Sequence, residues 1–268
     1  VALIPRVAIH LNRETNSGIK YDPARDLVAL YAAGTGSGSF YREVARTADC
    51  APEDVVAGDL VLYNNQPGTV WGPEGEFVSA PRLDDLACVF ACTEGFLTAQ
   101  ERDMVPVLCV CDNEEIGSET KQGAASAFLP ETLTAITTAL GLTSGDYRRL
   151  VANSFLLSCD NGHARHPNHP ELADANEAPV LNGGVVGKHS PRYATDGVSA
   201  AVFTELCRRA EVPVQHYANR PDQMGGATLG NIADTKLPIP TVDSGLAQRA
   251  MHSCCETMGS RDVEAFVR

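Results

Sequence analysis

Two adjacent carboxylates, Glu114 and Glu115, follow an apolar run at residues 105–111 and stand just before Gly117. A buried strand that ends in two carboxylates is costly, because each buried carboxylate costs several kcal/mol unless a positive group meets it. A metal ion would supply positive charge to both carboxylates. In such a pair, one Glu can bind the metal while its neighbour accepts a proton from the attacking water.

Three other segments combine acids or histidines with the ends of predicted elements: residues 81–86 with Asp84, 158–168 with Asp160, and 250–253 with His252. Each has an ordinary structural explanation. An Asp before a helix is a common N-cap, acids are favoured in a first helical turn, and a lone helical His is usually structural. Taken together, the side chains form an oxygen-rich ligand set that suits two hydrolytic metal ions, Zn²⁺ or alternatively Mn²⁺ or Co²⁺.

Composition excludes several classes of protein. The net charge of −13 over 268 residues argues against binding to nucleic acid or to an anionic membrane surface. No apolar run reaches the roughly eighteen residues of a membrane-spanning helix. Nine cysteines lie mostly in apolar runs without a C-x-x-C motif, which favours a reducing, cytoplasmic compartment. The first ten residues do not resemble a signal peptide and read as a chain entered in mid-sequence.

The chain divides into two regions near a turn-rich segment at residues 66–76. Before it, we expect a helix at 39–48 and a strand from Asp59 to Asn64. After it, helices and strands alternate, which predicts an α/β fold with a largely parallel sheet. We expect helices at 83–99, 119–140 (interrupted near Pro130), 195–211, 226–235 and 246–257, and strands at 104–111, 154–159, 212–217 and 238–242.

Several ordered motifs resemble the M18 metallopeptidases, which are the aspartyl aminopeptidases and their bacterial relatives. The similarity runs through nearly the whole chain and rests on A-I-H-L-N-R at 8–13, S-A-P-R-L-D-D-L at 79–86, D-N-E-E-I-G-S at 112–118, S-x-D-x-x-H-A-x-H-P-N at 158–168, R-Y-A-T at 192–195, G-G-A-T-L-G at 225–230 and D-S-G-L-A-Q-R-A-M-H-S at 243–253. Related two-metal peptidases and deacylases would share the paired Glu but are not expected to carry the first and last of these motifs together.

The resemblance implies a fold and an activity. Residues 77–268 would form a three-layer α/β/α catalytic domain, incomplete at its N-terminus. Residues 1–76 would be the remainder of an inserted, mainly-β dimerisation domain. The expected activity is removal of N-terminal residues, acidic ones among them, from peptides by means of a water that bridges two metal ions. The expected assembly is a homo-oligomer built from dimers, a dodecamer in the family.

The resemblance also implies roles for individual residues. Asp84 would bridge both metals, and Glu115 would bind one of them. Asp160 would be a terminal ligand of one metal and His252 a terminal ligand of the other. Glu114 would be the general base. The Asp84–Asp85 peptide is similar to one that is cis in such enzymes.

Substrate contacts follow from the same comparison. His10 would reach the site of a neighbouring subunit, and His163 and His166 would lie in or near the pocket beside Asp160. Lys188, or less favourably Arg192, would recognise an acidic substrate side chain. Pocket-lining segments of the family carry Tyr193, Gly226 and Thr228.

One expected ligand is not found. Family members carry an upstream H-x-D motif whose His completes one metal site, and no His in these 268 residues is followed by x-Asp. The alternative to an active aminopeptidase is therefore a catalytically impaired fragment or truncated homologue that can still assemble.

Overall fold

The computed structural model describes residues 1–34, 36, 38–100, 103–223 and 225–268. The chain forms two compact units, Val1–Leu62 and Tyr63–Arg268. The predicted boundary lies after residue 76, whereas residues 63–76 group with the second unit. The reason is that β1 (Thr69–Trp71) pairs antiparallel with β2 (Phe77–Ala80). The assignment of residues 1–76 to a dimerisation domain stays a prediction.

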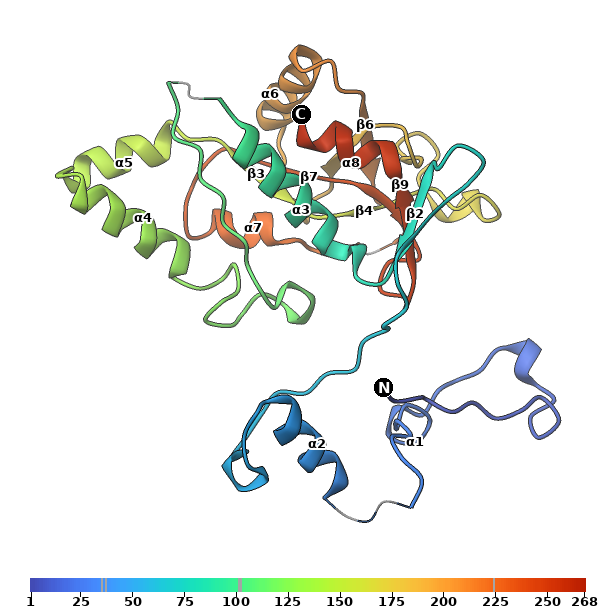
Figure 1. Ribbon diagram of the computed structural model, residues 1–268. Coiled ribbons are helices and arrows are strands. Elements are labelled where there is room, and N and C mark those ends of the chain that lie inside the picture. Colours follow the sequence, from blue (N-terminus) through green and yellow to red (C-terminus); the bar gives the residue numbers. More distant parts are fainter. Residues whose placement is uncertain (35, 37, 101–102, 224) are drawn as a thin grey trace. The chain divides into compact units, whose positions relative to one another are not determined.

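The first unit contains short helical elements (Figure 1): α1 (Pro23–Asp26), α2 (Ser39–Thr47), and 3-10 turns at Thr15–Ser17 and Pro52–Asp54. The helix predicted at 39–48 is confirmed by α2. The strand predicted from Asp59 to Asn64 does not form, and Val61 is 84% exposed. Among the described residues of this unit, β pairing is limited to an isolated bridge between Leu3 and Leu30, where a mainly-β domain is expected.

Two sheets form the centre of the second unit. A four-stranded sheet has the order β3 (Leu156–Cys159), β7 (Thr241–Gly245), β5 (Val185–His189), β6 (Val214–Ala218). A five-stranded sheet has the order β1, β2, β9 (Glu256–Gly259), β8 (Ala247–Arg249), β4 (Gly162–His163). The α/β class is confirmed. Both sheets are mixed rather than largely parallel, because β5 pairs antiparallel with β7, and β9 pairs antiparallel with β2 and β8.

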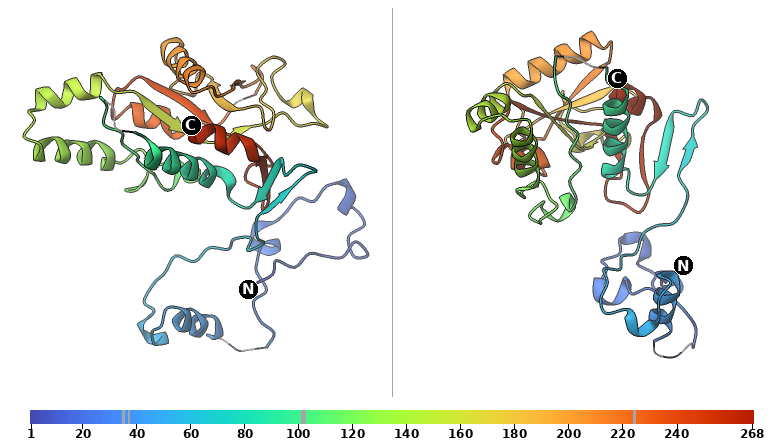
Figure 2. Two further views of the ribbon diagram at one scale, coloured as in Figure 1. Left: turned by 45° about the horizontal axis from the view of Figure 1, so that its top comes forward. Right: turned by 60° about the vertical axis from the view of Figure 1, so that its left-hand side comes forward.

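The helices of the second unit flank these strands (Figure 2): α3 (Leu83–Thr98), α4 (Phe128–Ala139), α5 (Ser144–Ala152), α6 (Gly197–Arg209), α7 (Leu229–Asp234) and α8 (Ser260–Val267). Successive strand residues point to opposite faces. Val242 packs with Phe203 of α6, whereas the next residue, Asp243, contacts Thr228 at the start of α7. Helices therefore cover both faces of β7, which gives the predicted three layers.

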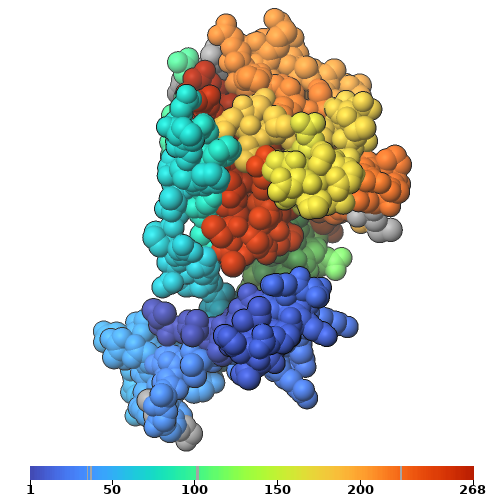
Figure 3. Space-filling model, turned by 90° about the vertical axis from the view of Figure 1, so that its right-hand side faces the viewer, coloured from blue at the N-terminus to red at the C-terminus, as the bar shows by residue number. Residues whose placement is uncertain are grey.

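Strand pairing joins segments far apart in the sequence. β4 lies parallel to β8, with Gly162 opposite Ala247. In Figure 3 the chain near residues 160–180, coloured yellow, accordingly lies beside the red C-terminal part on one face of the second unit. No helix among the described residues is long and apolar enough to cross a membrane.

The strand predicted at 104–111 is wrong. These residues are not part of any described sheet, and Val105 and Val107 are 88% and 57% exposed. An apolar run becomes a buried strand only where neighbouring strands bond its backbone. No described strand pairs with residues 104–111, and apolar composition by itself was not sufficient to predict a strand.

The helix predicted at 246–257 is also wrong. This segment forms β8, a turn and β9, and the final helix begins only at Ser260. Short apolar runs do not distinguish a buried strand from a helix by periodicity, and here Leu246 and Ala247 are both fully buried. The helix predicted at 119–140 begins only at Phe128, so Pro130 lies in its first turn, where proline is tolerated. The separate helix α5 was not predicted.

Phe203 anchors α6 in the core and supplies a stability prediction. It is 6% exposed and packs with Val185, Val212 and Val242. Replacing Phe203 with Ala should lower the free energy of unfolding by about 3–5 kcal/mol, because a large cavity remains. Val198→Ala, on the same helix but 70% exposed, should change it by less than about 0.5 kcal/mol. Urea unfolding measures both, and equal losses would contradict the packing described here.

Candidate metal centre

The paired glutamates lie on a tight turn. Glu114–Ile116 form one turn of 3-10 helix between two residues in the left-handed region, Asn113 (φ 60°) and Gly117 (φ 103°). The N–H groups of Gly117 and Ser118 donate back to the carbonyls of Glu114 and Asn113 at 2.9 Å each. Glycine adopts this conformation at no steric cost. The turn therefore holds both acids at fixed positions after residues 105–111.

Asp84 lies in the irregular first turn of α3. Its φ/ψ angles are not helical, and the predicted cis peptide joins it to Asp85. Asn161, which is buried, fixes this turn: its backbone N–H donates to Asp85 Oδ1 at 3.1 Å, and its side-chain amide donates to the Leu83 carbonyl at 2.9 Å. Asn161, which lies between β3 and β4, thus holds the start of α3 in place.

His252 lies in the turn between β8 and β9, in a left-handed conformation with φ 63°. Its Nε2 atom is 3.1 Å from Asp84 Oδ2 and 3.0 Å from Glu115 Oε2. Three residues that are distant in the sequence therefore bring one nitrogen and two oxygens together.

Two ligand clusters result. One contains Asp84, Glu115 and His252, and the other contains Asp84, Asp85 and Asp160, with the potential ligand atoms of each cluster within 4.8 Å of one another. Asp84 belongs to both. Its Oδ1 atom is buried and has no hydrogen-bond partner among the described residues, which is costly unless a cation occupies that side. Oxygen-rich donors with one imidazole fit a divalent cation such as Zn²⁺.

The carboxylates raise one another's pKa values. Burial, followed by the charges of Asp160 and Glu115, raises the pKa of Asp84 to about 8. Burial and Asp160 raise the pKa of Asp85 to about 9, and the same two causes with Glu115 raise the pKa of Glu114 to about 7. A bound cation reverses this effect, since an opposite charge favours the ionised form.

Lys188 has a different environment from the one predicted. The side chain is 1% exposed, and its Nζ lies 2.8 Å from Asp160 Oδ2, on a carboxylate that is 15% exposed. Burial by itself would lower the pKa of Lys188, but Asp160 keeps it above the ordinary value. The ammonium group compensates Asp160 instead of facing solvent, where a substrate side chain would meet it.

The other predicted substrate contacts have mixed positions. The Lys188 ammonium lies 5.6 Å from the centre of the Tyr193 ring. His163 and Gly226 are exposed. Thr228 is buried, and its hydroxyl donates to Asp243 at 2.6 Å. His10 is exposed in the first unit. The roles of these residues stay predictions.

Three structural residues of the site were not predicted: Asn161, Asp243 and Glu256. Asp243 accepts bonds from Thr228 and from the backbone of Ala194 at 2.6 Å, so it joins two predicted pocket segments. Asn161 and Asp243 lie inside motifs quoted above, and Glu256 lies three residues after the last of them. Only the tertiary contacts reveal what each residue holds.

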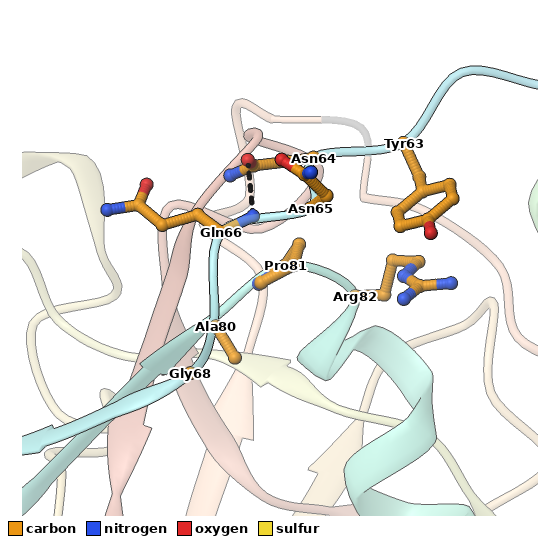
Figure 4. Close-up of a pocket in the computed structure, with 8 residues that line it drawn as sticks. All are labelled: Tyr63, Asn64, Asn65, Gln66, Gly68, Ala80, Pro81 and Arg82. Carbon is orange, nitrogen blue, oxygen red and sulfur yellow. Dashed lines mark hydrogen bonds between the residues drawn. The ribbon is translucent and has the colours of Figure 1, made fainter. Parts of the chain in front are cut away.

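An open pocket of about 300 Å³ adjoins the start of α3 (Figure 4). It is lined by residues from 63–68 and 80–82. The Arg82 guanidinium lies 5.0 Å from the centre of the Tyr63 ring, a cation–π arrangement. Asn64 donates to the Cys254 carbonyl at 2.7 Å, which ties this wall of the pocket to the turn that carries His252.

The Lys188–Asp160 pair yields a prediction about stability. In Lys188→Met, Asp160 would be left buried without its partner, and the metal-free protein should lose about 3–5 kcal/mol of unfolding free energy. Added Zn²⁺ should recover more stability in the variant than in the parent, because the cation would then be the main partner of Asp160. Urea unfolding with chelator and with Zn²⁺ measures this. Exposed Lys236→Met is the control, and an undiminished metal-free stability of Lys188→Met would refute the role.

Comparison with known proteins identifies a family of metalloproteases. The family described as "Aminopeptidase I zinc metalloprotease (M18)" matches residues 1–268. "Probable M18 family aminopeptidase 2" of Mycobacterium leprae is 40% identical over 265 residues, covering 98% of this chain and 62% of that protein. The protein of the same name from Clostridium novyi is 39% identical over 270 residues, with the same coverage. The chain thus spans about three fifths of the length of these relatives.

Solved structures show the same fold. The mApe1 dodecamer of S. cerevesiae is 34% identical with a TM-score of 0.76, covering 85% of this chain and 52% of that one. An M18 aminopeptidase of Thermotoga maritima has a TM-score of 0.84 over 99% of this chain and 63% of that one, and at 20% identity it supports the fold alone. From its sequence match over the full 268 residues and its close relatives, the chain belongs to the M18 family of zinc metalloproteases.

Proposed function

We propose that the protein is a metal-dependent aminopeptidase that removes N-terminal residues from peptides. The observation that carries the proposal is the half-buried Glu114 next to the ligand cluster of Asp84, Glu115 and His252. Hydrolysis of an amide needs a base close to the attacking water and a positive charge close to the developing oxyanion. A cation held by this cluster would place both requirements at one site.

Two divalent ions, most favourably Zn²⁺ and alternatively Mn²⁺ or Co²⁺, would share Asp84. Asp84, Glu115 and His252 would hold one ion, and Asp84 and Asp160 the other. When bound, such ions polarise a carbonyl and lower the pKa of water. Asp85 lies in the second cluster, but its Oδ1 accepts the backbone N–H of Asn161, so we assign it to positioning.

The chain's own residues carry the proton. Glu114 would accept a proton from the attacking water and deliver it to the leaving amine. A carboxylate suits this transfer when its pKa lies near the working pH. Lys188 neutralises Asp160 and so reduces the net negative charge close to Glu114.

The finer specificity is a separate proposal. An acidic preference needs a cation that substrate can reach, and Lys188 is engaged with Asp160. Arg192, which is exposed, is therefore the better candidate. Peptides would be the substrates, and the dodecamer of the yeast relative supports self-association of this chain. Nine free thiols are consistent with a cytoplasmic location.

Glu114→Gln tests the proposal. The variant should keep its metal content and lose turnover by about 10²–10⁴-fold, the usual contribution of a general base. The measurements are elemental analysis and hydrolysis of aspartyl and leucyl anilides, in this chain and in any longer chain that the gene encodes. Exposed Glu119→Gln, with the same change of charge, should retain activity.

Two results would count against this reading. Loss of metal from Glu114→Gln would make Glu114 a ligand instead of the base. Metal bound by the parent protein without any hydrolysis would favour the alternative of an impaired module that retains assembly.

A further inference from the structure

Glu256 is a buried acid for which the proposed reaction has no task. It begins β9 and is 2% exposed. Its two carboxylate oxygens accept hydrogen bonds from two different backbone N–H groups. Oε2 accepts from Asp84 at 2.9 Å, and Oε1 accepts from His252 at 2.7 Å. One side chain thereby joins two segments that are 168 positions apart, the start of α3 and the turn between β8 and β9.

Neither segment is fixed by regular structure. Asp84 has non-helical angles in the first turn of α3, and N–H groups in a first turn have no acceptor within their own helix. His252 has a left-handed conformation, and its side chain is 61% exposed, so little packing restrains it. A buried carboxylate that bonds both N–H groups supplies the missing acceptors and restrains both residues.

We propose that Glu256 is a positioning residue that sets the spacing of Asp84 and His252, so that Asp84 Oδ2 and His252 Nε2 can bind the same cation. This inference rests on the ligand roles of Asp84 and His252 in the proposed function. Glu256 does not touch the cation. It acts through the backbones of two residues that do, and the 3.1 Å separation of their ligand atoms depends on it.

Two substitutions separate position from charge. Glu256→Asp keeps the negative charge, but its shorter side chain cannot reach both N–H groups. Glu256→Gln keeps the shape but removes the charge and one of the two acceptors, because an amide offers a single oxygen. Exposed Glu131→Gln on α4 is the matched control for net charge.

The test is the affinity for Zn²⁺, measured by competition with a chelator, together with the visible spectrum of the Co²⁺-loaded protein, which reports ligand geometry. Both Glu256 variants should bind Zn²⁺ about 10–100-fold more weakly than the parent, the range found when supports of metal ligands are removed, and both should show an altered Co²⁺ spectrum. The control should match the parent. Where Glu256→Asp does not fold, the Co²⁺ spectrum of the isosteric Gln variant decides.

Three outcomes would overturn the proposal. Unchanged affinity and spectrum in variants of lower metal-free stability would reduce Glu256 to a structural role. Weaker binding in Glu256→Gln alone, with an unchanged spectrum, would show an effect of charge. Absence of any Zn²⁺ binding by the parent protein would overturn the ligand assignment itself, and with it the proposed function.

Discussion

The structure depends on how it keeps several carboxylates close together. Five carboxylates converge where α3 begins, at the turn of residues 114–116, and where β3 ends: Asp84, Asp85, Glu114, Glu115 and Asp160. Like charges at this distance resist ionisation, and burial adds to the cost. The elevated pKa values of Asp84, Asp85 and Glu114 express that cost. Several contacts of the second unit offset this cost by stabilising individual carboxylates.

The carboxylates are met by different partners. Asp160 has the ammonium of Lys188, Asp85 has the backbone of Asn161, and Glu256 has two N–H groups. Asp84 Oδ1 has none among the described residues. Since the groups that only support the site are satisfied within the protein, the unmet demand for a partner is concentrated on Asp84, the residue that both ligand clusters share. This distribution favours a cation at Asp84 over a purely structural acidic cluster.

The sequence predicted the helices at 39–48 and 83–99 because each shows apolar residues at helical spacing or stands between clear turn signals. It failed at 104–111 and 246–257, where burial depends on which strands lie alongside. The resemblance of their motifs also predicted that Asp84, Glu115 and His252 share one site. The sequence could not predict where the Lys188 side chain points, because a motif does not show whether a side chain faces substrate or a neighbouring acid.

The failures and the site have a common cause. Asp84 lies in an irregular helical turn, Glu114 and Glu115 lie between two left-handed residues, and His252 is itself left-handed. Such positions persist only where surrounding contacts fix them, and they concentrate at functional sites. The contacts that fix these ligands come from Asn161 and Glu256, which bond to residues distant in the sequence. Local pattern can therefore identify the ligands, whereas their geometry arises only when the sheets and α3 have assembled.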